Sequence, residues 1–319
     1  MISVVVPNFN KSIYIEDTLK SIDNQDSINW ECIIIDDNST DSSVSLIKNF
    51  IKTKSKFRLI VNHENHGASH CRNLGINRSK GKHIIFLDSD DVISSSCFSN
   101  RIKQISKNNK LDFAVFPMGT FNKIVGDNNS KWNNFNGNHL NRFLSHDLPW
   151  AICSVIWKKE SLIKLGGFNE GFSRLQDVEL HTKALINSYF YATFSSHNSD
   201  CFYRIDNNRI KDYLSHCLNV INGKMYFITF FSSVKIKNFN SKHLRGTYFE
   251  CYCFVFNLYR IKKISKSDVL IILSTIDTTN FKNIFNFSSF SIINFYCFIR
   301  INGIYFKGIN RVFKFLFIS

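Results

Sequence analysis

Residues 84–91 have the sequence Ile-Ile-Phe-Leu-Asp-Ser-Asp-Asp, an apolar run of strand length that ends in an acidic loop. A short apolar run bounded by turn-forming residues is typical of a strand buried on both faces. Asp88 and Asp90 are two residues apart, so in an extended chain their side chains leave on the same side. This arrangement suits one divalent cation, because Mg²⁺ and Mn²⁺ take oxygen ligands and complete their shells with phosphate and water. A helix cap is the alternative interpretation, since Asp and Ser also favour N-caps.

Short apolar runs recur through the first 118 residues and alternate with amphipathic segments. Runs of strand length lie at residues 2–6, 32–35, 57–61, 83–87 and 113–116. Apolar residues at helical spacing predict helices near residues 15–22, 44–51 and 67–79. Strands that alternate with helices form right-handed crossovers, so we expect an α/β fold with a mainly parallel central sheet flanked by helices.

Polar residues follow several of these predicted strands, at the edge where open α/β sheets bind ligands. Asp37 follows the second strand, where its carboxylate would accept a hydrogen bond from the ring N–H of uracil or guanine. Capping of the next helix is the alternative role of this loop, and the two roles are compatible. The sequence has no GxGxxG after the first strand and no GxxxxGK[ST] motif. A bound diphosphate would therefore be balanced by a metal ion and by side chains such as Arg72, whose planar fork fits phosphate oxygens.

These loops, taken in order, resemble the N-terminal half of family 2 glycosyltransferases. The resemblance is carried by these blocks: Val5-Val6-Pro7-Asn8-Phe9-Asn10, Ile35-Asp36-Asp37-Asn38-Ser39-Thr40-Asp41, Asn65-His66-Gly67, Cys71-Arg72-Asn73-Leu74-Gly75, Phe86-Leu87-Asp88-Ser89-Asp90-Asp91, Gly166-Gly167-Phe168-Asn169-Glu170 and Gln176-Asp177-Val178-Glu179-Leu180. It covers roughly residues 1–205 and implies a GT-A fold.

The resemblance also implies roles for individual residues. It assigns donor binding to Pro7, Asn10, Asp37, Arg72, Asp88 and Ser89. Pro7 and Asp37 would lie at the nucleotide base, and Asp88 near the ribose or the sugar. Asp90 would bind the cofactor, Mn²⁺ or Mg²⁺, and Asp177 would be the catalytic base. An inverting transfer needs a carboxylate opposite the leaving diphosphate to take the proton of the acceptor hydroxyl.

The sequence departs from the family pattern at two positions. Gln176 precedes the expected base where the family often has Glu, and Asp206 stands where the family often has His. A carboxylate at position 206 would offer oxygen to the metal or the phosphates but also adds negative charge, so Asp206 is a secondary candidate. Glu179 and Trp150 are further secondary candidates, for acceptor contact. Rings can pack on the C–H faces of sugars, but core packing is the alternative for Trp150, Trp157 and Phe172.

The chain divides by pattern into three regions. Residues 1–118 form the nucleotide-sugar-binding half, and residues 119–210 form the acceptor-binding and catalytic-base half of the same GT-A domain. Residues 119–147 are rich in Asn, Ser, Lys and Gly and predict a loop over the sheet, whereas residues 177–186 predict a helix. Residues 211–319 form a mostly helical, basic and aromatic extension.

Other reactive side chains offer alternatives of lower weight. His63, His66 and His70 have a spacing that suits zinc, although the family resemblance accounts for this segment without a metal. Nine cysteines, an odd number with no CxxC pair, indicate reduced thiols in a cytoplasmic protein. We find neither a signal-peptide core nor an uncharged apolar run long enough to predict a membrane span.

The formal net charge is +15, and residues 211–319 carry 15 Lys and Arg against 4 Asp and Glu. Residues 281–319 mix aromatic and basic side chains without an acidic residue, which favours peripheral contact with an anionic membrane. A helix pair packed on the catalytic domain is the alternative. Nucleic acid is a rival partner for the charge, but no nucleic-acid motif supports it, so we expect none.

The sequence therefore predicts an inverting, metal-dependent glycosyltransferase. Its donor would be a nucleotide sugar, expected to be a UDP-sugar, and its acceptor a hydroxyl of a glycan or a polyprenyl-diphosphate-linked oligosaccharide. The expected pathway is bacterial surface polysaccharide synthesis, such as O-antigen or capsule, at the cytoplasmic face of the cell membrane. The alternatives are a nucleotide-sugar-binding protein without catalysis, and a basic membrane or nucleic-acid adaptor on the same fold.

Overall fold

A computed structural model describes residues 1–27, 29–128, 130–206, 210–234, 241–276, 287–305 and 308–318. Within it the chain forms two compact units. One comprises residues 1–136 and 148–206, and the other residues 137–147 and 207–319. Each unit is described here by itself.

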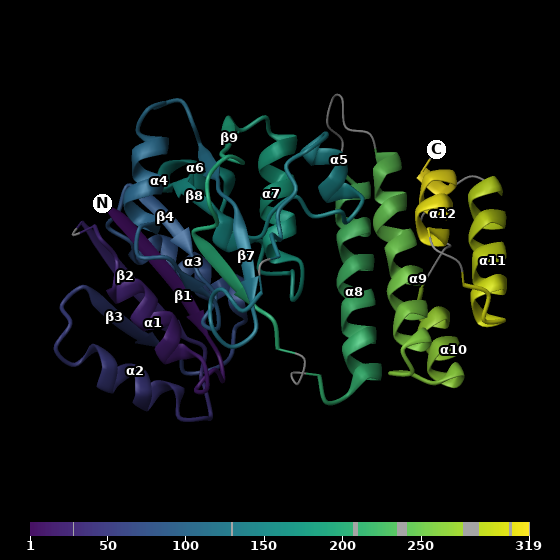
Figure 1. Ribbon diagram of the computed structural model, residues 1–319, viewed down its shortest axis with the longest axis horizontal. Helices are drawn as coiled ribbons and strands as arrows, with labels where there is room; N and C mark the ends of the chain where they lie inside the picture. The colour runs from purple at the N-terminus through teal and green to yellow at the C-terminus, as the bar shows by residue number, and fades with distance from the viewer. Residues whose placement is uncertain are drawn as a thin grey trace. The chain divides into compact units, whose positions relative to one another are not determined.

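The first unit is built on a seven-stranded sheet with the order β3-β2-β1-β4-β8-β6-β9 (Figure 1). Its strands are β1 (Ile2–Asn8), β2 (Trp30–Asp36), β3 (Phe57–Val61), β4 (His83–Phe86), β6 (Phe113–Val115), β8 (Val155–Lys158) and β9 (Tyr191–Thr193). Strands β3, β2, β1 and β4 are parallel, β8 is antiparallel to β4 and β6, and β9 is parallel to β6. The predicted α/β fold with a mainly parallel sheet is confirmed, and each predicted strand run coincides with a strand.

Helices flank this sheet, and some of them bury an apolar stripe. They are α1 (Ile15–Asp23), α2 (Ser43–Ile51), α3 (Ala68–Arg78), α4 (Cys97–Ile105), α6 (Lys159–Leu165) and α7 (Gln176–Ile186). In α1, Ile15, Leu19 and Ile22 are fully buried, at the spacing that the sequence predicted. Helix α3 packs on β1 and β2, and its approach to β1 is close: a Cβ atom at Gly75 would lie 2.2 Å from Val5 Cγ1.

A second, three-stranded sheet joins the acidic loop to the later part of this unit. It has the order β5-β10-β7, from β5 (Val92–Ile93), β10 (Cys201–Arg204) and β7 (Met118–Phe121). Strand β5 directly follows the acidic residues 88–91, and β10 pairs with it in antiparallel register. This pairing brings residues 204–206 to the acidic loop.

Residues 119–147, predicted to be a loop, contain two regular elements. Strand β7 reaches Phe121, and α5 (His139–Leu144) begins after Asn138, whose side chain accepts a hydrogen bond from Asn141 N. Phe143 and Leu144 are buried, which explains why a helix of six residues is stable here. Residues 137–147 group with the C-terminal unit, not with the half to which the sequence assigned them.

The C-terminal unit is helical, as predicted. It contains α8 (Tyr213–Ser232), the short 3₁₀ helix η2 (Ser241–His243), α9 (Leu244–Arg260), α10 (Lys266–Thr275), α11 (Phe287–Ile301) and α12 (Ile309–Ile318). Helix α9 is central, since it contacts α5, α8, α10, α11 and α12. Within the described residues, we find no helix that combines the length and the hydropathy needed to cross a membrane. All nine cysteines are free, and eight of them are buried.

Candidate donor-binding and catalytic site

The loops after β1 and β2 are fastened to each other by side-chain hydrogen bonds. Buried Asn8 donates from Nδ2 to Asp36 Oδ2 (2.7 Å). Asp36 also accepts hydrogen bonds from the backbone N–H (2.9 Å) and the hydroxyl (2.7 Å) of Ser39. Asn10, in the left-handed backbone region at φ 51°, accepts from Thr40 N through Oδ1 at 2.8 Å. The amide oxygen of Asn10 therefore shapes the loop. Pro7, the other candidate in this loop, is buried and pairs in register with Ile35.

Asp37 ties the end of β2 to the segment that precedes α3. Its carboxylate accepts hydrogen bonds from Asn62 Nδ2 (2.9 Å), His66 N (3.0 Å) and Gly67 N (2.7 Å). Burial would raise the pKa of Asp37, but these hydrogen bonds outweigh it and hold the pKa below its usual value. Asp37 is thus an ionised acceptor, which is the state that would receive a ring N–H from a base.

Arg72 and Asp88 form an ion pair at the edge of the sheet. Arg72, buried on α3, donates from Nη2 to Asp88 Oδ1 at 2.7 Å. Its guanidinium also lies over the ring of Phe168, at 5.4 Å from the centroid. The Nε and Nη1 atoms of Arg72 are buried and have no hydrogen-bond partner. Because buried donors are normally satisfied, these two N–H groups indicate that a ligand with acceptor oxygens belongs here.

The second carboxylate of the acidic loop also contacts a cation. Lys11 Nζ lies 2.6 Å from Asp90 Oδ2, and the Asp90 side chain is buried. Next to it, Asp91 Oδ1 accepts from Arg204 N at 3.0 Å, and Arg204 Nε donates to the carbonyl oxygen of Asp90 at 2.9 Å. Burial, together with the like charges of Asp90 and Asp88, raises the pKa of Asp91. Ser89, also predicted at this site, lies between Asp88 and Asp90 in the sequence, and its side chain is buried.

Strand β10 brings a further acidic residue close to the same loop. Asp206 Oδ2 accepts a hydrogen bond from the Tyr14 hydroxyl. The Arg204 guanidinium lies over the ring of Tyr14, 4.9 Å from its centroid. Arg204 Nη2 also donates to Asp17 at 3.0 Å. Asp206 therefore lies next to α1 and the acidic loop, although it is 115 residues after Asp91 in the sequence.

Asp177 is the second residue of α7, which begins directly after Leu175 in the left-handed backbone conformation. The preceding turn is fixed to α3, since Asn73 donates from Nδ2 to Phe168 O (2.9 Å) and to Glu170 Oε1 (2.8 Å). This attachment holds Asp177 near Arg72 and Asp88. Burial raises the pKa of Asp177, the positive charge of Arg72 opposes that shift, and the negative charge of Asp88 adds to it.

The structure therefore brings together groups that are far apart in the sequence. Arg72 contacts Asp88 and acts electrostatically on Asp177, while Asp88 acts on Asp177 and on Asp91. Raised carboxyl pKa values beside unsatisfied cationic donors are characteristic of functional sites. Chemically, the cluster can hold a polyanion and accept a proton.

Two secondary candidates face the interior instead. Trp150 is 1% exposed, and its ring packs near those of Tyr191 (5.7 Å) and His181 (5.8 Å). Glu179 is fully buried, with Lys183 at 3.2 Å on the same helix. Both side chains are buried, and contact of either one with an acceptor stays a prediction. The alternative of core packing applies to Trp150, and equally to Trp157 and Phe172, which are buried.

Two of the histidines considered as zinc ligands, His66 and His70, lie next to each other and to glutamate side chains. The rings of His66 and His70 lie 4.5 Å apart, and His70 Nδ1 lies 3.2 Å from Glu170 Oε2. His66 Nε2 is 3.7 Å from Glu64. Across the described part of the chain, no group of three or more His, Cys, Asp and Glu side chains is arranged to hold a metal by itself.

The acidic loop nevertheless offers the ligand type that Mg²⁺ and Mn²⁺ prefer. Asp88 and Asp90 present carboxylate oxygens, and the Lys11 contact shows that Asp90 accommodates a positive charge. Since the protein alone does not complete a coordination shell among the described residues, a divalent cation would take further ligands from the diphosphate and from water.

Lys11 and Tyr14 were not predicted as site residues. Each follows the first strand within a few positions, so the signal available in the sequence was a basic and a phenolic side chain in the loop after β1. Their partners, Asp90 and Asp206, are 79 and 192 residues away.

Comparison with known proteins identifies related sequences and folds. A model of the family described as glycosyl transferase family 2 matches residues 3–166. The chain is 38% identical over 91 residues to a putative teichuronic acid biosynthesis glycosyltransferase, TuaG, of Bacillus subtilis, covering 28% of this chain and 36% of the relative. It is 27% identical over 213 residues to a GalNAc(5)-diNAcBac-PP-undecaprenol beta-1,3-glucosyltransferase of Campylobacter jejuni, covering 64% of each protein. The matches thus span less than two thirds of the length of these relatives.

Solved structures share the fold at low sequence identity. Residues 1–349 of S. aureus TarS in complex with UDP-GlcNAc match with a TM-score of 0.66 and 15% identity, covering 99% of this chain and 90% of that one. The mannosyltransferase PcManGT from Pyrobaculum calidifontis, in complex with GDP-Man and Mn²⁺, matches with a TM-score of 0.57 and 16% identity, covering 99% and 83%. These likenesses establish the GT-A fold.

Proposed function

The chain belongs to glycosyl transferase family 2, and from this premise we propose that it transfers a sugar from a nucleoside diphosphate to an acceptor hydroxyl with inversion at the anomeric carbon. We propose UDP as the nucleotide. The S. aureus TarS fragment of similar fold is a complex with UDP-GlcNAc, and the ionised Asp37 would accept the ring N–H of uracil.

The observation that carries this proposal is the pair of unsatisfied donors on Arg72. Its fork is held by Asp88 on one side, and its other two nitrogens, Nε and Nη1, are buried and have no acceptor among the described residues. The oxygens of a diphosphate are such acceptors, and Arg is the side chain best suited to bind them. Asp177 stands within electrostatic range of the same guanidinium. A donor diphosphate on Arg72 would therefore lie beside a carboxylate that can act as base.

In the proposed reaction Asp177 accepts the proton of the acceptor hydroxyl. The acceptor oxygen forms a bond to the anomeric carbon while the bond from that carbon to the diphosphate oxygen breaks, and the nucleoside diphosphate leaves. Burial raises the pKa of Asp177, which makes its carboxylate a stronger base, and the positive charge of Arg72 opposes this rise. A single displacement from the side opposite the diphosphate inverts the anomeric configuration.

We propose Mn²⁺ or Mg²⁺ as cofactor, held by Asp90 with Asp88 beside it. Bound there, the ion would neutralise charge on the departing diphosphate. The structural relative PcManGT contains Mn²⁺, and the carboxylate oxygens of the acidic loop have the right chemistry. Asp206, next to the loop, is a further oxygen donor that we propose as secondary.

We propose a glycan or a polyprenyl-diphosphate-linked oligosaccharide as acceptor, in bacterial surface polysaccharide synthesis. The names of the Bacillus subtilis and Campylobacter jejuni relatives support this class. We also propose peripheral contact with the inner face of the cell membrane. It is supported by exposed apolar side chains on the basic helices α11 and α12, including Phe298 and Phe315. Residues 281–286 of the predicted membrane segment lie outside the described residues.

The decisive experiment is release of UDP from a panel of nucleotide sugars, with and without Mn²⁺. Asp177→Asn should lower turnover by at least a hundredfold while leaving donor affinity within about twofold, because it removes the proton acceptor and not the phosphate contacts. Asp90→Ala should weaken both Mn²⁺ and donor binding. Glu160→Gln, an exposed carboxylate on α6, is the matched control and should behave as wild type.

Other outcomes would favour other functions. Near-normal transfer by Asp177→Asn would refute the assignment of the base. Silence of the wild type across the donor panel, with UDP still bound, would favour a nucleotide-sugar-binding protein without catalysis. Absorbance at 260 nm that persists through purification until high salt is applied would favour a nucleic-acid adaptor.

A further inference from the structure

A basic cavity of about 620 Å³ lies within the C-terminal unit. It is lined by the last turn of α9, the end of α11, Tyr305 and residues 308–311, and its side chains include Arg260, Arg300 and Arg311. None of the described residues that line this cavity is acidic. The cavity therefore gathers three guanidinium groups without a counter-ion.

Arg300 is the most informative of the three. It is only 3% exposed, and among the residues that the structure describes no carboxylate pairs with it. Its guanidinium lies over the rings of Tyr305 (4.1 Å) and Tyr296 (5.6 Å), while its Nε has no hydrogen-bond partner. Contact with aromatic rings and a position at the C-terminal end of α11 both favour a cation, but each effect is smaller than the desolvation penalty of a buried charge. Buried charges are normally paired, so the burial of Arg300 indicates an anionic ligand.

Other groups of the cavity would also receive an anion. The Tyr305 hydroxyl is buried and has no hydrogen-bond partner. Gly308 and Ile309 line the cavity at the N-terminal end of α12, where backbone N–H groups and the helix dipole favour negative charge. Arg260 and Arg311 are exposed at the cavity and can move toward a ligand without leaving a packed core. Donors thus surround the cavity from three elements.

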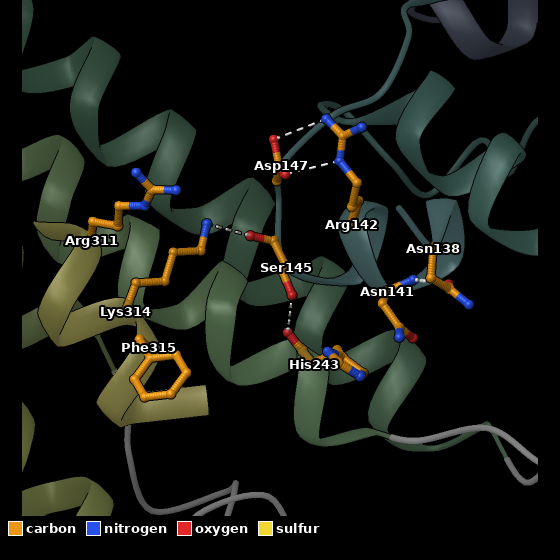
Figure 2. A pocket seen from close by; sticks show the side chains of 9 residues that line it. All are labelled: Asn138, Asn141, Arg142, Ser145, Asp147, His243, Arg311, Lys314 and Phe315. Atoms are coloured by element: carbon orange, nitrogen blue, oxygen red, sulfur yellow. Dashed lines mark hydrogen bonds and ion pairs between the residues drawn. The ribbon is translucent and has the colours of Figure 1, made fainter. Parts of the chain in front are cut away.

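A neighbouring cavity of about 600 Å³ provides a comparison (Figure 2). Arg311 lines both cavities. In the second, Arg142 is held by Asp147 through two N–H groups (2.9 and 3.2 Å), and Lys314 contacts Glu250 at 2.8 Å. Figure 2 shows Arg142 turned to Asp147 and Lys314 turned to Ser145, with Arg311 apart from both pairs. Arg142 and Lys314 of the second cavity already have carboxylate partners, which directs an incoming anion to the side of Arg260 and Arg300.

The charge and the surroundings indicate the class of ligand. One phosphate monoester carries about 1.5 to 2 negative charges near pH 7, so three guanidinium groups match a diphosphate better than a single phosphate. On the same two helices, large apolar side chains are exposed: Phe295 (59%), Phe298 (62%) and Phe315 (72%). Because α11 and α12 are in contact with each other, these exposed rings offer apolar surface to a hydrocarbon chain.

We propose that the cavity at Arg260, Arg300 and Arg311 binds the diphosphate group of a lipid diphosphate, whose hydrocarbon chain lies on the apolar surface of α11 and α12. The inference rests on the proposed function in one respect: it makes this lipid the carrier of the acceptor glycan. The binding site itself is independent of the catalytic residues. The diphosphate would supply acceptors for the unpaired Arg300 and Tyr305 groups.

The test is calorimetric titration of the full chain with farnesyl diphosphate, inorganic diphosphate and farnesol. We expect farnesyl diphosphate to bind at least tenfold more tightly than the other two. Arg260→Gln and Arg311→Gln should each weaken its binding about tenfold or more, because each removes a charge-assisted contact. Lys266→Gln, which removes an exposed charge of the same unit away from the cavity, is the matched control and should bind as wild type. UDP affinity should be unchanged in all three variants.

Each result decides the proposal. Wild-type affinity in Arg260→Gln and Arg311→Gln would overturn it, and since both side chains are exposed this test does not depend on Arg300→Gln folding. Equal affinity for inorganic diphosphate would overturn the lipid part and assign the cavity to a soluble phosphate. Binding of farnesyl diphosphate by a chain that releases UDP from no donor would refute the proposed function and leave this site standing. UDP release without such binding would do the reverse.

Discussion

Asp37→Asn is the substitution that best tests how the loop after β2 is built. The carboxylate accepts three hydrogen bonds, from Asn62 Nδ2, His66 N and Gly67 N, at 2.7–3.0 Å. An amide keeps one oxygen for the two donors on Oδ1, but its NH₂ group then faces Gly67 N, so the third bond is replaced by two opposed donors. A hydrogen bond to a charged group contributes about 1.5–3 kcal/mol, and the two remaining bonds become weaker neutral ones. We therefore expect the free energy of unfolding to fall by about 2–4 kcal/mol.

This loss can be measured by urea unfolding followed by tryptophan fluorescence. All four tryptophans lie in the first unit, so the signal reports the unit that contains Asp37. With an m value of about 2 kcal/mol/M, the expected loss lowers the unfolding midpoint by about 1–2 M urea. Asp26→Asn is the control, since that carboxylate accepts a surface hydrogen bond from Ser99 at 2.7 Å and should change stability by less than about 0.5 kcal/mol.

The same variant predicts the pH dependence of stability. Hydrogen bonds hold the folded pKa of Asp37 below its unfolded value despite burial, so its stabilisation is complete above the unfolded pKa of about 3.9. That stabilisation is lost as the pH falls through the folded pKa. The difference between wild type and Asp37→Asn should thus be constant between pH 5 and 7, within roughly a few tenths of a kcal/mol, and shrink in acid. A difference below about 0.5 kcal/mol at pH 7, or one that does not change in acid, would refute an ionised, triply bonded Asp37.

Three further substitutions test the scaffold and the phosphate contact. Asp200→Asn breaks a buried fork-to-fork pair with Arg101 (2.6 and 2.9 Å) and should cost about 3–5 kcal/mol of unfolding free energy, and a loss below about 1 kcal/mol would contradict it. Gly75→Ala places a Cβ 2.2 Å from Val5 and should destabilise by about 1–2 kcal/mol in urea unfolding, although alanine is the better helix former. Arg72→Gln should weaken UDP binding, measured by calorimetry, about tenfold to a hundredfold. Arg72→Lys should recover only part of the affinity for UDP, because lysine lacks the planar fork. Unchanged affinity in both variants would exclude Arg72 from the proposed phosphate site.

Five strands of the first unit, β1, β2, β3, β4 and β6, could be predicted because each is a largely apolar run. Such runs arise where both faces of a parallel sheet are covered, as at β4, so the local pattern alone decides. Helix α5 gives no comparable signal, since it has six residues and buries two of them, Phe143 and Leu144. Its position is fixed by contacts distant in sequence, such as the bond from Thr247 Oγ1 to Leu144 O at 2.7 Å. A short helix that depends on tertiary contacts is not visible in composition.

The site shows the same division between local and distant information. The carboxylates at positions 37, 88 and 90 follow strands, and the rule that ligands bind at the carboxyl ends of strands was enough to select them. The cationic partner of Asp90 could not be selected, because nothing near Lys11 in the sequence indicates a loop 79 residues away. Trp150 shows a limit of the local pattern: an aromatic residue near a predicted site has the same pattern whether it lines a pocket or packs in the core, and in the structure its buried ring packs near Tyr191.

The distribution of charge connects the two units by one physical rule. In the first unit the buried cations have carboxylate partners: Arg72 has Asp88, Arg101 has Asp200 and Arg204 has Asp17. Residues 211–319 contain only 4 acidic side chains for 15 basic ones, so most cations there cannot be paired internally. An exposed lysine without a partner is simply solvated, but a buried guanidinium such as Arg300 is not, because water cannot replace the missing anion. The excess positive charge of the sequence therefore has a specific consequence where it is buried, as it is in the cavity at Arg300.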